Sequence, residues 1–379
     1  MMTEIKSANV ITHIDPDGFK TILINPIYAK DKPSVRTLEE KMKDVGANTG
    51  NLMFAEGIKD NLIVEREGWL SSETFSGVKR PVCIIPSANF IIHGGDTFIK
   101  ELQRFLDQTD CPLTLAGLGA QSSKELNTPQ KLISVLNTNT KKCFQRLAER
   151  AVSLGIRGEF TAECLELMGI YNYRIIGCPS VYHFSPLQNI PLKNPSLEKC
   201  QITVTTGNMY ESKIIEMGYQ LDAEWVMQMA TEMPECISQG ILASHVWINK
   251  RFPGIKLSTR EVNQYMKKKG HIFFTLEAWN QFYEKNEITF SFGSRFHGNI
   301  AALRNGVPAL WITHDSRTAE LVKSLHLPHI TQETFSEVQS PQQLIEYISY
   351  TDFFKNYPNL FKNYIEYLTE NHINFQYKV

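Results

Sequence analysis

The chain has 379 residues, of which 42% are hydrophobic and 21% are charged, and its formal net charge is -1. This length exceeds the usual size of one compact core, so two domains are expected. The nearly neutral charge excludes a nucleic-acid binder that depends on a basic field over its whole surface, but it is compatible with a local anion site.

The seven cysteines are scattered, odd in number and never form a C-x-x-C pair. We therefore expect reduced, mostly buried thiols in a cytoplasmic protein, and no metal site, because metal ligands do not cluster in the sequence. Residues 1–17 lack the pattern of a signal peptide, and no run of about 18 apolar residues predicts a membrane span. A location at the inner face of the membrane, through a partner or a lipid-linked substrate, is left open.

The first half of the chain alternates apolar runs with amphipathic segments. Strands are predicted over residues 19–27, 82–86, 113–118, 152–156 and 174–176. Helices are predicted over residues 98–106, 129–150 and 161–168. This alternation, with glycines at the strand ends, indicates parallel βαβ units with right-handed crossovers.

After a proline-rich stretch the same alternation resumes. Strands are predicted over residues 202–206, 271–276, 289–292 and 307–312, and helices over residues 224–238 and 279–283 and from Ile300 onward. The expected architecture is α/β, with two tandem Rossmann-like parallel-sheet domains that face a cleft. The predicted boundaries are an N-terminal domain over 1–185, a linker over 186–199, a C-terminal domain over 200–340 and C-terminal helices over 341–379 that pack back across both domains.

Loops after the predicted strands are where open α/β sheets bind ligands. One wall of the cleft is expected to carry the loops at Asn48, Gly94, Gly119 and Arg157. The other wall is expected to carry the loops at Asn208, Arg295–His297 and Asp315–Arg317.

Three arginines lie just after predicted strands: Arg157, Arg295 and Arg317. Their planar forks of donors match phosphate or carboxylate, so they imply an anionic ligand with more than one charged group. Pairing with a nearby acid is the alternative, with Glu159 for Arg157 and with Asp315 or Glu320 for Arg317. No acid lies within several residues of Arg295.

His297 stands two residues from Arg295, at the predicted start of a helix, where general acid or base work is credible. The chain has no G-x-S-x-G, no G-x-x-x-x-G-K-[ST] and no G-x-G-x-x-G after a strand. Hydrolase, P-loop and dinucleotide-binding interpretations are therefore not preferred.

The residues around Arg295 resemble the polysaccharide pyruvyl transferase family. The resemblance rests on G-S-R-F-H-G at 293–298, G-V-P at 306–308 and D-S-R at 315–317. Upstream pieces agree, namely N-T-G-N at 48–51, the pair Gly94–Gly95 and G-L-G-A at 117–120. It covers about residues 20–330, and its R-x-H-G element is the specific part.

This resemblance implies a GT-B-like fold and transfer of pyruvate from phosphoenolpyruvate onto two hydroxyls of a sugar, which forms a ketal and releases phosphate. Phosphoenolpyruvate is then a co-substrate, and no further cofactor is implied. The implied donor-binding residues are Arg157, Arg295, Arg317, Gly298 and Asn299. His297 is the candidate acid, and Asp96 or Asp315 is the candidate base.

The acceptor would be a saccharide of a cell-surface polysaccharide or its precursor, free, lipid-linked or nucleotide-linked. The loops assigned to it contain Asn48, Asn51, Gly94, Gly95, Asp96 and Asn208. Two departures from the family pattern concern this acceptor: Asp96 stands where many members have a third glycine, and residues 221–250 match nothing recognisable.

Two other functions stay open. A nucleotide-sugar glycosyltransferase on the same fold would hold a diphosphate at Arg295, with Glu320 as the candidate for binding ribose. A non-catalytic glycan-binding or scaffold protein would have lost the charges of the cleft, yet these are present. The sequence does not indicate an oligomeric state.

Overall fold

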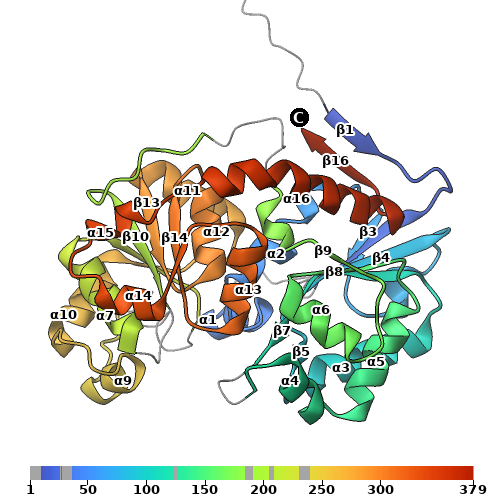
Figure 1. The fold of residues 1–379 in the computed structure, drawn as a ribbon, viewed down its shortest axis with the longest axis horizontal. Coiled ribbons are helices and arrows are strands. Elements are labelled where there is room, and N and C mark those ends of the chain that lie inside the picture. The colour runs from blue at the N-terminus through green and yellow to red at the C-terminus, as the bar shows by residue number, and fades with distance from the viewer. Residues whose placement is uncertain are drawn as a thin grey trace, which may run out of the picture. The chain divides into compact units, whose positions relative to one another are not determined.

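A computed structural model describes residues 10–25, 27, 36–122, 126–183, 191–204, 209–229 and 240–378 (Figure 1). The chain forms two compact units. Unit 1 comprises Met1–Tyr28, Ala55–Ile190 and Phe354–Val379. Unit 2 comprises Ala29–Phe54 and Pro191–Phe353. Each unit is therefore assembled from segments that are distant in the sequence.

Unit 1 is built on a six-stranded parallel sheet in the order β3-β2-β4-β6-β8-β9. Its strands are β2 (Lys20–Ile24), β3 (Arg66–Gly68), β4 (Pro81–Pro86), β6 (Leu113–Leu118), β8 (Leu154–Ile156) and β9 (Tyr173–Ile175). Its helices include α3 (Asp96–Gln108), α4 (Pro129–Val135), α5 (Thr138–Ala148) and α6 (Glu159–Glu166). Short 3₁₀ turns are η1 (Lys59–Asn61), η2 (Ser72–Thr74) and η3 (Pro179–Val181). A second, two-stranded sheet pairs β5 (Ile91–Ile92) with β7 (Ala120–Gln121).

Unit 2 has its own six-stranded parallel sheet in the order β12-β11-β10-β13-β14-β15. Its strands are β10 (Cys200–Val204), β11 (Glu224–Met227), β12 (Gly270–His271), β13 (Phe290–Gly293), β14 (Ala309–Thr313) and β15 (His329–Thr331). Its helices are α1 (Leu38–Asp44), α7 (Met209–Gln220), α9 (His245–Arg251), α10 (Thr259–Lys269), α11 (Leu276–Asn286), α12 (Phe296–Arg304), α13 (Ser316–Ser324), α14 (Gln332–Glu337) and α15 (Gln343–Glu346). Helices α2 (Asn51–Ala55) and α16 (Thr351–Glu370) each contain residues of both units.

The predicted α/β class with two parallel sheets is confirmed. The central strands are buried on both faces, as in β4, β6, β10, β13 and β14. Strands covered on both sides must be apolar throughout, which explains why they read as continuous hydrophobic runs in the sequence. Burial of these runs under helices is the main stabilising term in each unit.

Three predicted elements were wrong in type or extent. Residues 224–227 form the buried strand β11 instead of opening a helix, and residues 230–239 lie outside the part of the chain that the structure describes. The helix predicted over 129–150 is two helices, because Asn137 caps α5 by accepting a hydrogen bond from the N–H of Thr140 at 2.7 Å. The strand predicted over 271–276 ends early, since Thr275 caps α11.

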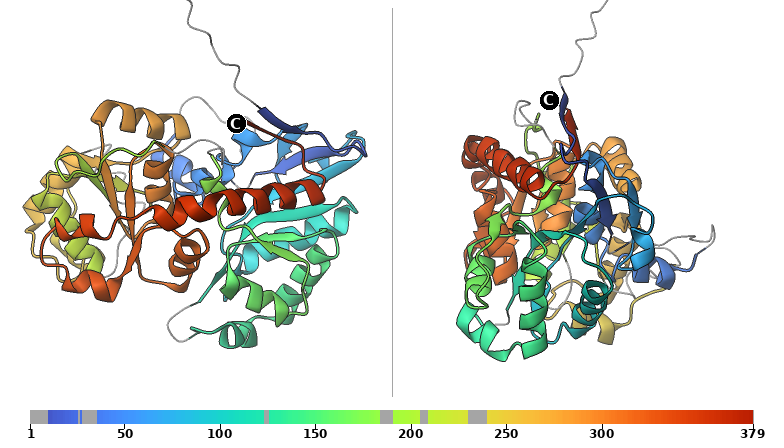
Figure 2. Two further views of the ribbon diagram at one scale, coloured as in Figure 1. Left: turned by 45° about the horizontal axis from the view of Figure 1, so that its top comes forward. Right: turned by 90° about the vertical axis from the view of Figure 1, so that its right-hand side faces the viewer.

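The pairing between the two ends of the described chain was not predicted from the sequence. Strand β1 (Val10–His13) runs antiparallel to β16 (Phe375–Lys378), beside α16, as Figure 2 shows. Asn374 strengthens this junction because its Oδ1 accepts from the N–H of Asp15 at 2.7 Å and its Nδ2 donates to the carbonyl of Phe19 at 2.9 Å.

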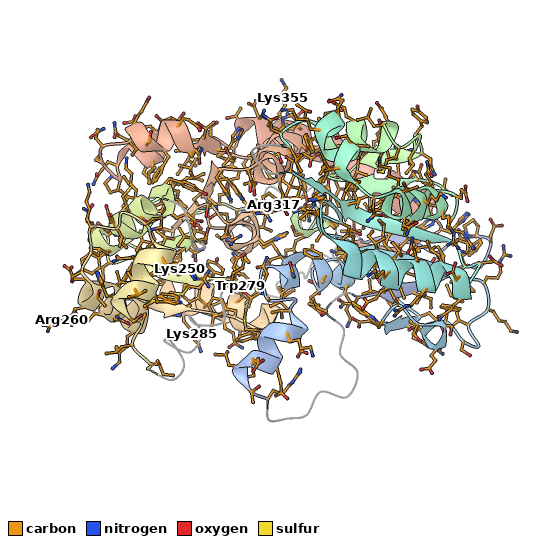
Figure 3. The ribbon with its side chains drawn as sticks, turned by 90° about the horizontal axis from the view of Figure 1, so that it is seen from below. Lys250, Arg260, Trp279, Lys285, Arg317 and Lys355 are labelled. Atoms are coloured by element: carbon orange, nitrogen blue, oxygen red, sulfur yellow. The ribbon has the colours of Figure 1, made fainter. Side chains whose placement is uncertain are left out.

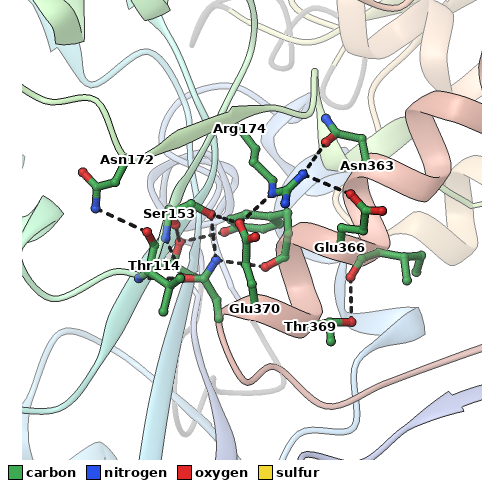
Figure 4. A network of polar contacts seen from close by, with 12 residues as sticks. Thr114, Ser153, Asn172, Arg174, Asn363, Glu366, Thr369 and Glu370 are labelled. Atoms are coloured by element: carbon green, nitrogen blue, oxygen red, sulfur yellow. Dashed lines mark hydrogen bonds and ion pairs between the residues drawn. The ribbon is translucent and has the colours of Figure 1, made fainter.

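Helix α16 is fixed to the sheet of unit 1 by polar contacts (Figure 4). The Arg174 guanidinium in β9 reaches Glu370 at 2.7 Å and Glu366 at 3.1 Å. Just after the helix, the buried Asn371 accepts hydrogen bonds from the N–H groups of Val152 at 3.2 Å and Ser153 at 3.3 Å. The turn before β8 therefore depends on one side chain from the far end of the chain.

We expect Asn371→Ala to lower the free energy of unfolding by about 2 kcal/mol, because the buried N–H group of Ser153 loses its acceptor. Urea unfolding monitored by circular dichroism measures this change. The matched control is Thr369→Ala, an exposed position on the last turn of α16, where a change within about 0.5 kcal/mol is expected. Equal stability of the two variants would contradict the role given to Asn371.

Candidate active site

The turn between β13 and α12 is shaped by a close approach to β10. A Cβ atom on Gly293, whose φ is +149°, would lie 2.0 Å from the carbonyl oxygen of Thr203. The same oxygen accepts from the N–H groups of Ser294 at 2.9 Å and Arg295 at 3.3 Å. Only glycine fits this position, and the turn carries Arg295 to the N-cap of α12.

The side chain of Asn299 bonds to β10, β13 and β14, and its contact with β10 is a hydrogen bond from Thr203 Oγ1 to Asn299 Oδ1 at 3.3 Å. Its Oδ1 accepts from the hydroxyl of Ser291 at 2.7 Å, and its Nδ2 donates to the carbonyls of Gly293 at 3.2 Å and Leu310 at 3.3 Å. It is 0% exposed. These contacts give Asn299 a structural role inside the sheet, and its assignment to the donor stays a prediction.

Arg295 is a buried cation with few acceptors. Its side chain is 8% exposed, its Nη2 lies 2.9 Å from the sulfur of Met229, and its Nε has no acceptor among the described residues. A thioether is a weak acceptor compared with an oxygen. Burial lowers the pKa of the guanidinium to about 10, with Arg317 acting in the same direction, so Arg295 stays charged at neutral pH.

A carboxylate that sequence inspection missed lies near this arginine. Glu211 on α7 is 1% exposed and accepts a hydrogen bond from the hydroxyl of Ser294. Its negative charge acts to raise the pKa of Arg295 and partly offsets the burial. The sequence signal was an acidic residue shortly after a buried strand, but α7 itself had not been predicted.

His297 lies one residue into α12 and is partly exposed. Its ring packs at 5.5 Å between centroids against Phe54, and at 5.2 Å against Phe296. Its Cβ also faces the loop at Gly50, where an added methyl group would come within 3.2 Å of it. Aromatic packing on two sides fixes the ring beside Arg295.

The loop with N-T-G-N packs directly on this turn. The N–H of Thr49 donates to the carbonyl of Gln228 at 2.8 Å, and Asn48 forms a bridge with Met229. Asn48 was expected on the opposite wall of the cleft from Arg295. That expectation was wrong, because Asn48 and Asn51 belong to unit 2.

Gln228 is a second residue that sequence inspection missed. It is 2% exposed, and its Nε2 has no acceptor within the described ranges. Methyl groups added at Gly50 and Gly298 would lie 2.4 Å and 2.3 Å from its amide atoms. Gly50 and Gly298 are therefore both needed to seat this amide, and Gln228 was overlooked because β11 had been taken for a helix.

Asp315 and Arg317 are paired, as the alternative interpretation of Arg317 proposed. Arg317 Nη2 lies 3.2 Å from Asp315 Oδ2, and Asp315 Oδ1 accepts from the N–H of Thr318 at 2.7 Å to cap α13. Burial acts to raise the pKa of Asp315, but the positive charges beside it and this cap hold the pKa below its usual value. The ion pair with Arg317 and the lowered pKa make Asp315 a weak base.

His314 precedes this pair at the end of β14. Its Nε2 is 3.5 Å from Asp315 Oδ2, and its Nδ1 has no acceptor among the residues described. Burial lowers the pKa of His314, although Asp315 opposes that effect, so a neutral imidazole is expected at pH 7. Of the two neighbours, His314 is better suited than Asp315 to accept a proton.

The predicted residues of unit 1 form a separate group. Arg157 is 2% exposed, and its guanidinium donates to the carbonyls of Gly117 at 2.9 Å and Ser87 at 3.2 Å and to Asn89 Oδ1. A methyl group on Gly119 would lie 2.6 Å from Arg157 Cδ. The G-L-G-A motif thus makes room for an arginine that ties β4 to β6.

The other predicted loop of unit 1 leads into α3. Gly94 has a φ of +81°, and Gly95 is the N-cap residue of α3, which begins at Asp96. The side chain of Asp96 and the whole of Asn208 lie outside the described part of the structure. Their assignment to the acceptor stays a prediction.

Sequence comparison decides the family. A model of the polysaccharide pyruvyl transferase family matches residues 7–316. The chain belongs to the polysaccharide pyruvyl transferase family. The R-x-H-G element of this family member is thus the turn that places Arg295 and His297. No curated protein sequence matches the chain.

Two solved structures are similar to this chain at low sequence identity. The structure of S. aureus MnaA with UDP is 11% identical, covers 92% of this chain and 98% of its own, and gives a TM-score of 0.38. The glycotransferase of kitacinnamycin is 10% identical, covers 93% of this chain and 88% of its own, and gives a TM-score of 0.34. At these values the likeness carries no information about the substrate of this chain.

Two further features concern membrane-spanning helices and metal ligands. No helix within the described ranges is long and apolar enough to span a bilayer. One group, Asp15, Asp17 and His372, has the spacing of metal ligands in the described part of the chain. The Asp15 carboxylate there already accepts from the N–H groups of Asp17 and Phe19 and contacts His372 at 2.7 Å, so these contacts account for the cluster.

We expect Asp315→Asn to lower the free energy of unfolding of the protein by about 1–2 kcal/mol at pH 7, because the ion pair with Arg317 is lost. The folded-state pKa of Asp315 is depressed. Its contribution is therefore fully present above the unfolded pKa of about 4 and is lost as the pH falls through the folded pKa. Urea unfolding across pH 3–7 should show the gap to wild type shrinking below about pH 4.

Asp107→Asn serves as the control, because the Asp107 side chain is 63% exposed in its contact with Arg146. This variant should stay within about 0.5 kcal/mol of wild type at every pH. A gap for Asp315→Asn that keeps its full size at pH 3 would show that the stabilisation does not come from the ionised carboxylate.

Proposed function

We propose that this protein is a ketal pyruvyltransferase that uses phosphoenolpyruvate as the donor and a saccharide of a cell-surface polysaccharide, or its precursor, as the acceptor. Family membership supports the reaction class. The observation that carries the donor assignment is the buried guanidinium of Arg295, whose Nε lacks an acceptor within the described chain. A buried cation with unused donors is strongly stabilised by a bound anion.

Phosphoenolpyruvate has the two anionic groups that this region can hold. Its phosphate or its carboxylate would accept hydrogen bonds from Arg295, and the positive charge of Arg317 acts on the same region. The amide of Gln228 offers a further buried donor beside the turn. Arg157 is already bonded to protein acceptors through Nε, Nη1 and Nη2, so its part in donor binding remains a proposal by family resemblance.

The chemistry requires one acid and removal of two hydroxyl protons. His297, as imidazolium, would donate a proton to the methylene carbon of phosphoenolpyruvate, which becomes a methyl group and leaves an oxocarbenium ion at the central carbon. The first sugar hydroxyl adds there and loses its proton. Phosphate then leaves with its bonding electrons, and the second hydroxyl adds to the same carbon and loses its proton. The products are the cyclic ketal and inorganic phosphate.

We propose His314 as the base that accepts a proton from the sugar hydroxyl. His314 is buried, is expected to be neutral and lies beside the turn that carries Arg317, which favours it over the ion-paired Asp315. The saccharide would reach the site through the loop with Asn48 and Asn51, which packs on the His297 turn. We propose that the enzyme acts in the cytoplasm, where phosphoenolpyruvate is made.

We expect Arg295→Ala to weaken phosphoenolpyruvate binding about 100-fold, because two hydrogen bonds to a charged group are lost. Isothermal titration measures the affinity, with UDP-sugars as the comparison ligands. Arg295→Lys should recover part of the affinity, since it restores the charge without the fork. The exposed Arg260→Ala is the matched control and should bind like wild type.

Tight binding of a UDP-sugar with no response to phosphoenolpyruvate would overturn this proposal in favour of a glycosyltransferase. Unchanged phosphoenolpyruvate affinity in Arg295→Ala would contradict the assignment of Arg295 to the donor site, but it would not contradict phosphoenolpyruvate as the donor.

We expect His297→Ala to keep the affinity for phosphoenolpyruvate within about twofold and to lower turnover about 100-fold or more, because general acid catalysis is lost. Phosphate release measures turnover, with whichever member of a panel of methyl hexosides and UDP-hexosamines supports the wild-type enzyme. The same reaction in deuterated water labels the methyl group of the product. Wild-type turnover in the variant would exclude His297 as the acid.

A further inference from the structure

The segment that leads into α9 exposes aliphatic side chains that no part of the proposed reaction uses. Ile241, Leu242 and Val246 are 50%, 72% and 77% exposed. They fall within six residues of the chain, and Val10, Ile11 and Ile14 form the other such group of three among the described residues. Clustered exposed apolar residues mark an interaction site more often than single ones do.

This segment is anchored to the rest of unit 2. Ala243 is held by Asn263 on α10, which accepts from its N–H at 2.7 Å and donates to its carbonyl at 2.9 Å. The ring of His245 contacts the hydroxyl of Thr259 at 3.0 Å. The aliphatic side chains are therefore presented on a fixed backbone, directly before and within the first turn of α9.

Basic residues follow these aliphatic groups in the sequence, and the first acidic residue after them is Glu261, which caps α10. Residues 240–260 contain Lys250, Arg251, Lys256 and Arg260 and no aspartate or glutamate. Lys250 stands one helical turn after Val246 on α9, and Arg260 follows the Thr259 that contacts His245. Figure 3 labels Lys250 and Arg260 on these two helices. We call Ile241, Leu242, Val246, Lys250 and Arg260 the α9 surface.

The basic side chains of the α9 surface differ in their ion pairing from Lys267–Lys269 in the last turn of α10. Lys268 and Lys269 are paired with Asp222 at 3.0 Å, and Lys269 also reaches Glu224 at 2.8 Å. Among the residues that the structure describes, no ion pair involves Lys250 or Arg260. Lys268 and Lys269 therefore serve the fold, and within the described chain the positive charges of Lys250 and Arg260 are not used in this way.

We propose that the α9 surface docks the protein onto a bilayer that contains anionic lipids. Exposed aliphatic groups next to basic groups are the combination that peripheral binding needs, because the aliphatic groups enter the headgroup boundary and the basic groups bind lipid phosphates. A nucleic acid would use the basic groups but would leave Leu242 and Val246 in water. The inference concerns attachment only and does not depend on the donor or acceptor.

Co-sedimentation of the full chain with vesicles tests this proposal. Vesicles of phosphatidylglycerol and phosphatidylcholine in equal parts should pellet the protein, and vesicles of phosphatidylcholine alone should not. Raising the salt from 50 to 500 mM should weaken binding, since the basic groups act through screened charges. Lys250→Glu/Arg260→Glu should weaken binding about 25-fold, at about fivefold for each basic side chain lost. Leu242→Asp/Val246→Asp should weaken it about tenfold or more.

Two control variants keep the test specific. Lys142→Glu/Lys355→Glu changes the net charge equally at exposed positions of unit 1, and Leu167→Asp/Tyr171→Asp places the same substitutions at exposed apolar positions there. Both should bind vesicles like wild type. Circular dichroism establishes that each variant is folded.

Three results would overturn the proposal. The first is no binding of the folded wild-type protein to anionic vesicles. The second is equal loss of binding in the control variants, which would indicate a general charge effect. The third is a dimer, seen by analytical ultracentrifugation, that Leu242→Asp/Val246→Asp dissociates while vesicle binding is unchanged, because a second copy would then be the occupant of this surface.

Discussion

The carbonyl oxygen of Thr203 occupies the space in which a side chain at position 293 would begin. The strand β13 can pass so close to the end of β10 only because Gly293 has no Cβ, and that contact sets the direction of the chain through Ser294 to Arg295. Arg295 is then carried into the interior instead of into water. The placement of the whole R-x-H-G element thus depends on one steric constraint between two neighbouring strands.

Burying Arg295 is costly, and its surroundings explain how the fold tolerates it. Glu211 and Asp315 act to keep the guanidinium charged, while Arg317 opposes them. The compensation is incomplete, since one nitrogen has no acceptor and another faces a sulfur atom. Such a site is prepared for an anion before the anion arrives, so little reorganisation is needed upon binding. The same logic separates Arg295 from Arg157, whose nitrogens are bonded to backbone and amide oxygens.

Sequence patterns predicted the parts of the structure that depend on local properties. Buried central strands are continuous apolar runs, so β4, β6, β13 and β14 could be located and the parallel α/β class inferred. The R-x-H-G turn could also be placed, because a strand, a glycine and a helix follow one another there. What could not be predicted depends on contacts between distant segments. Gln228 enters the site only because β11 is a strand. The spacing of the methionines in this segment resembled that of a helix, so the strand was not predicted.

The same distinction applies to the glycine motifs. Gly117 and Gly119 looked like a ligand loop, yet Gly119 leaves room for the side chain of Arg157, and a methyl group on Gly117 would lie 2.6 Å from Pro179. A glycine in a loop indicates that another group lies close to the backbone, but the sequence alone does not distinguish a ligand from a side chain of the protein. Gly50 and Gly298 show the same ambiguity, since both face the amide of Gln228.

The composition of unit 1 from three separate segments has a consequence for biosynthesis. Residues 354–379 supply most of α16 and the strand β16, which pairs with β1. During translation, residues 191–353 of unit 2 leave the ribosome before these last segments exist. The sheet of unit 1 must therefore wait, with part of its surface uncovered, while the other unit can already fold. Nascent chains of this enzyme should be most prone to misassociation in that interval, which gives chaperones a defined substrate.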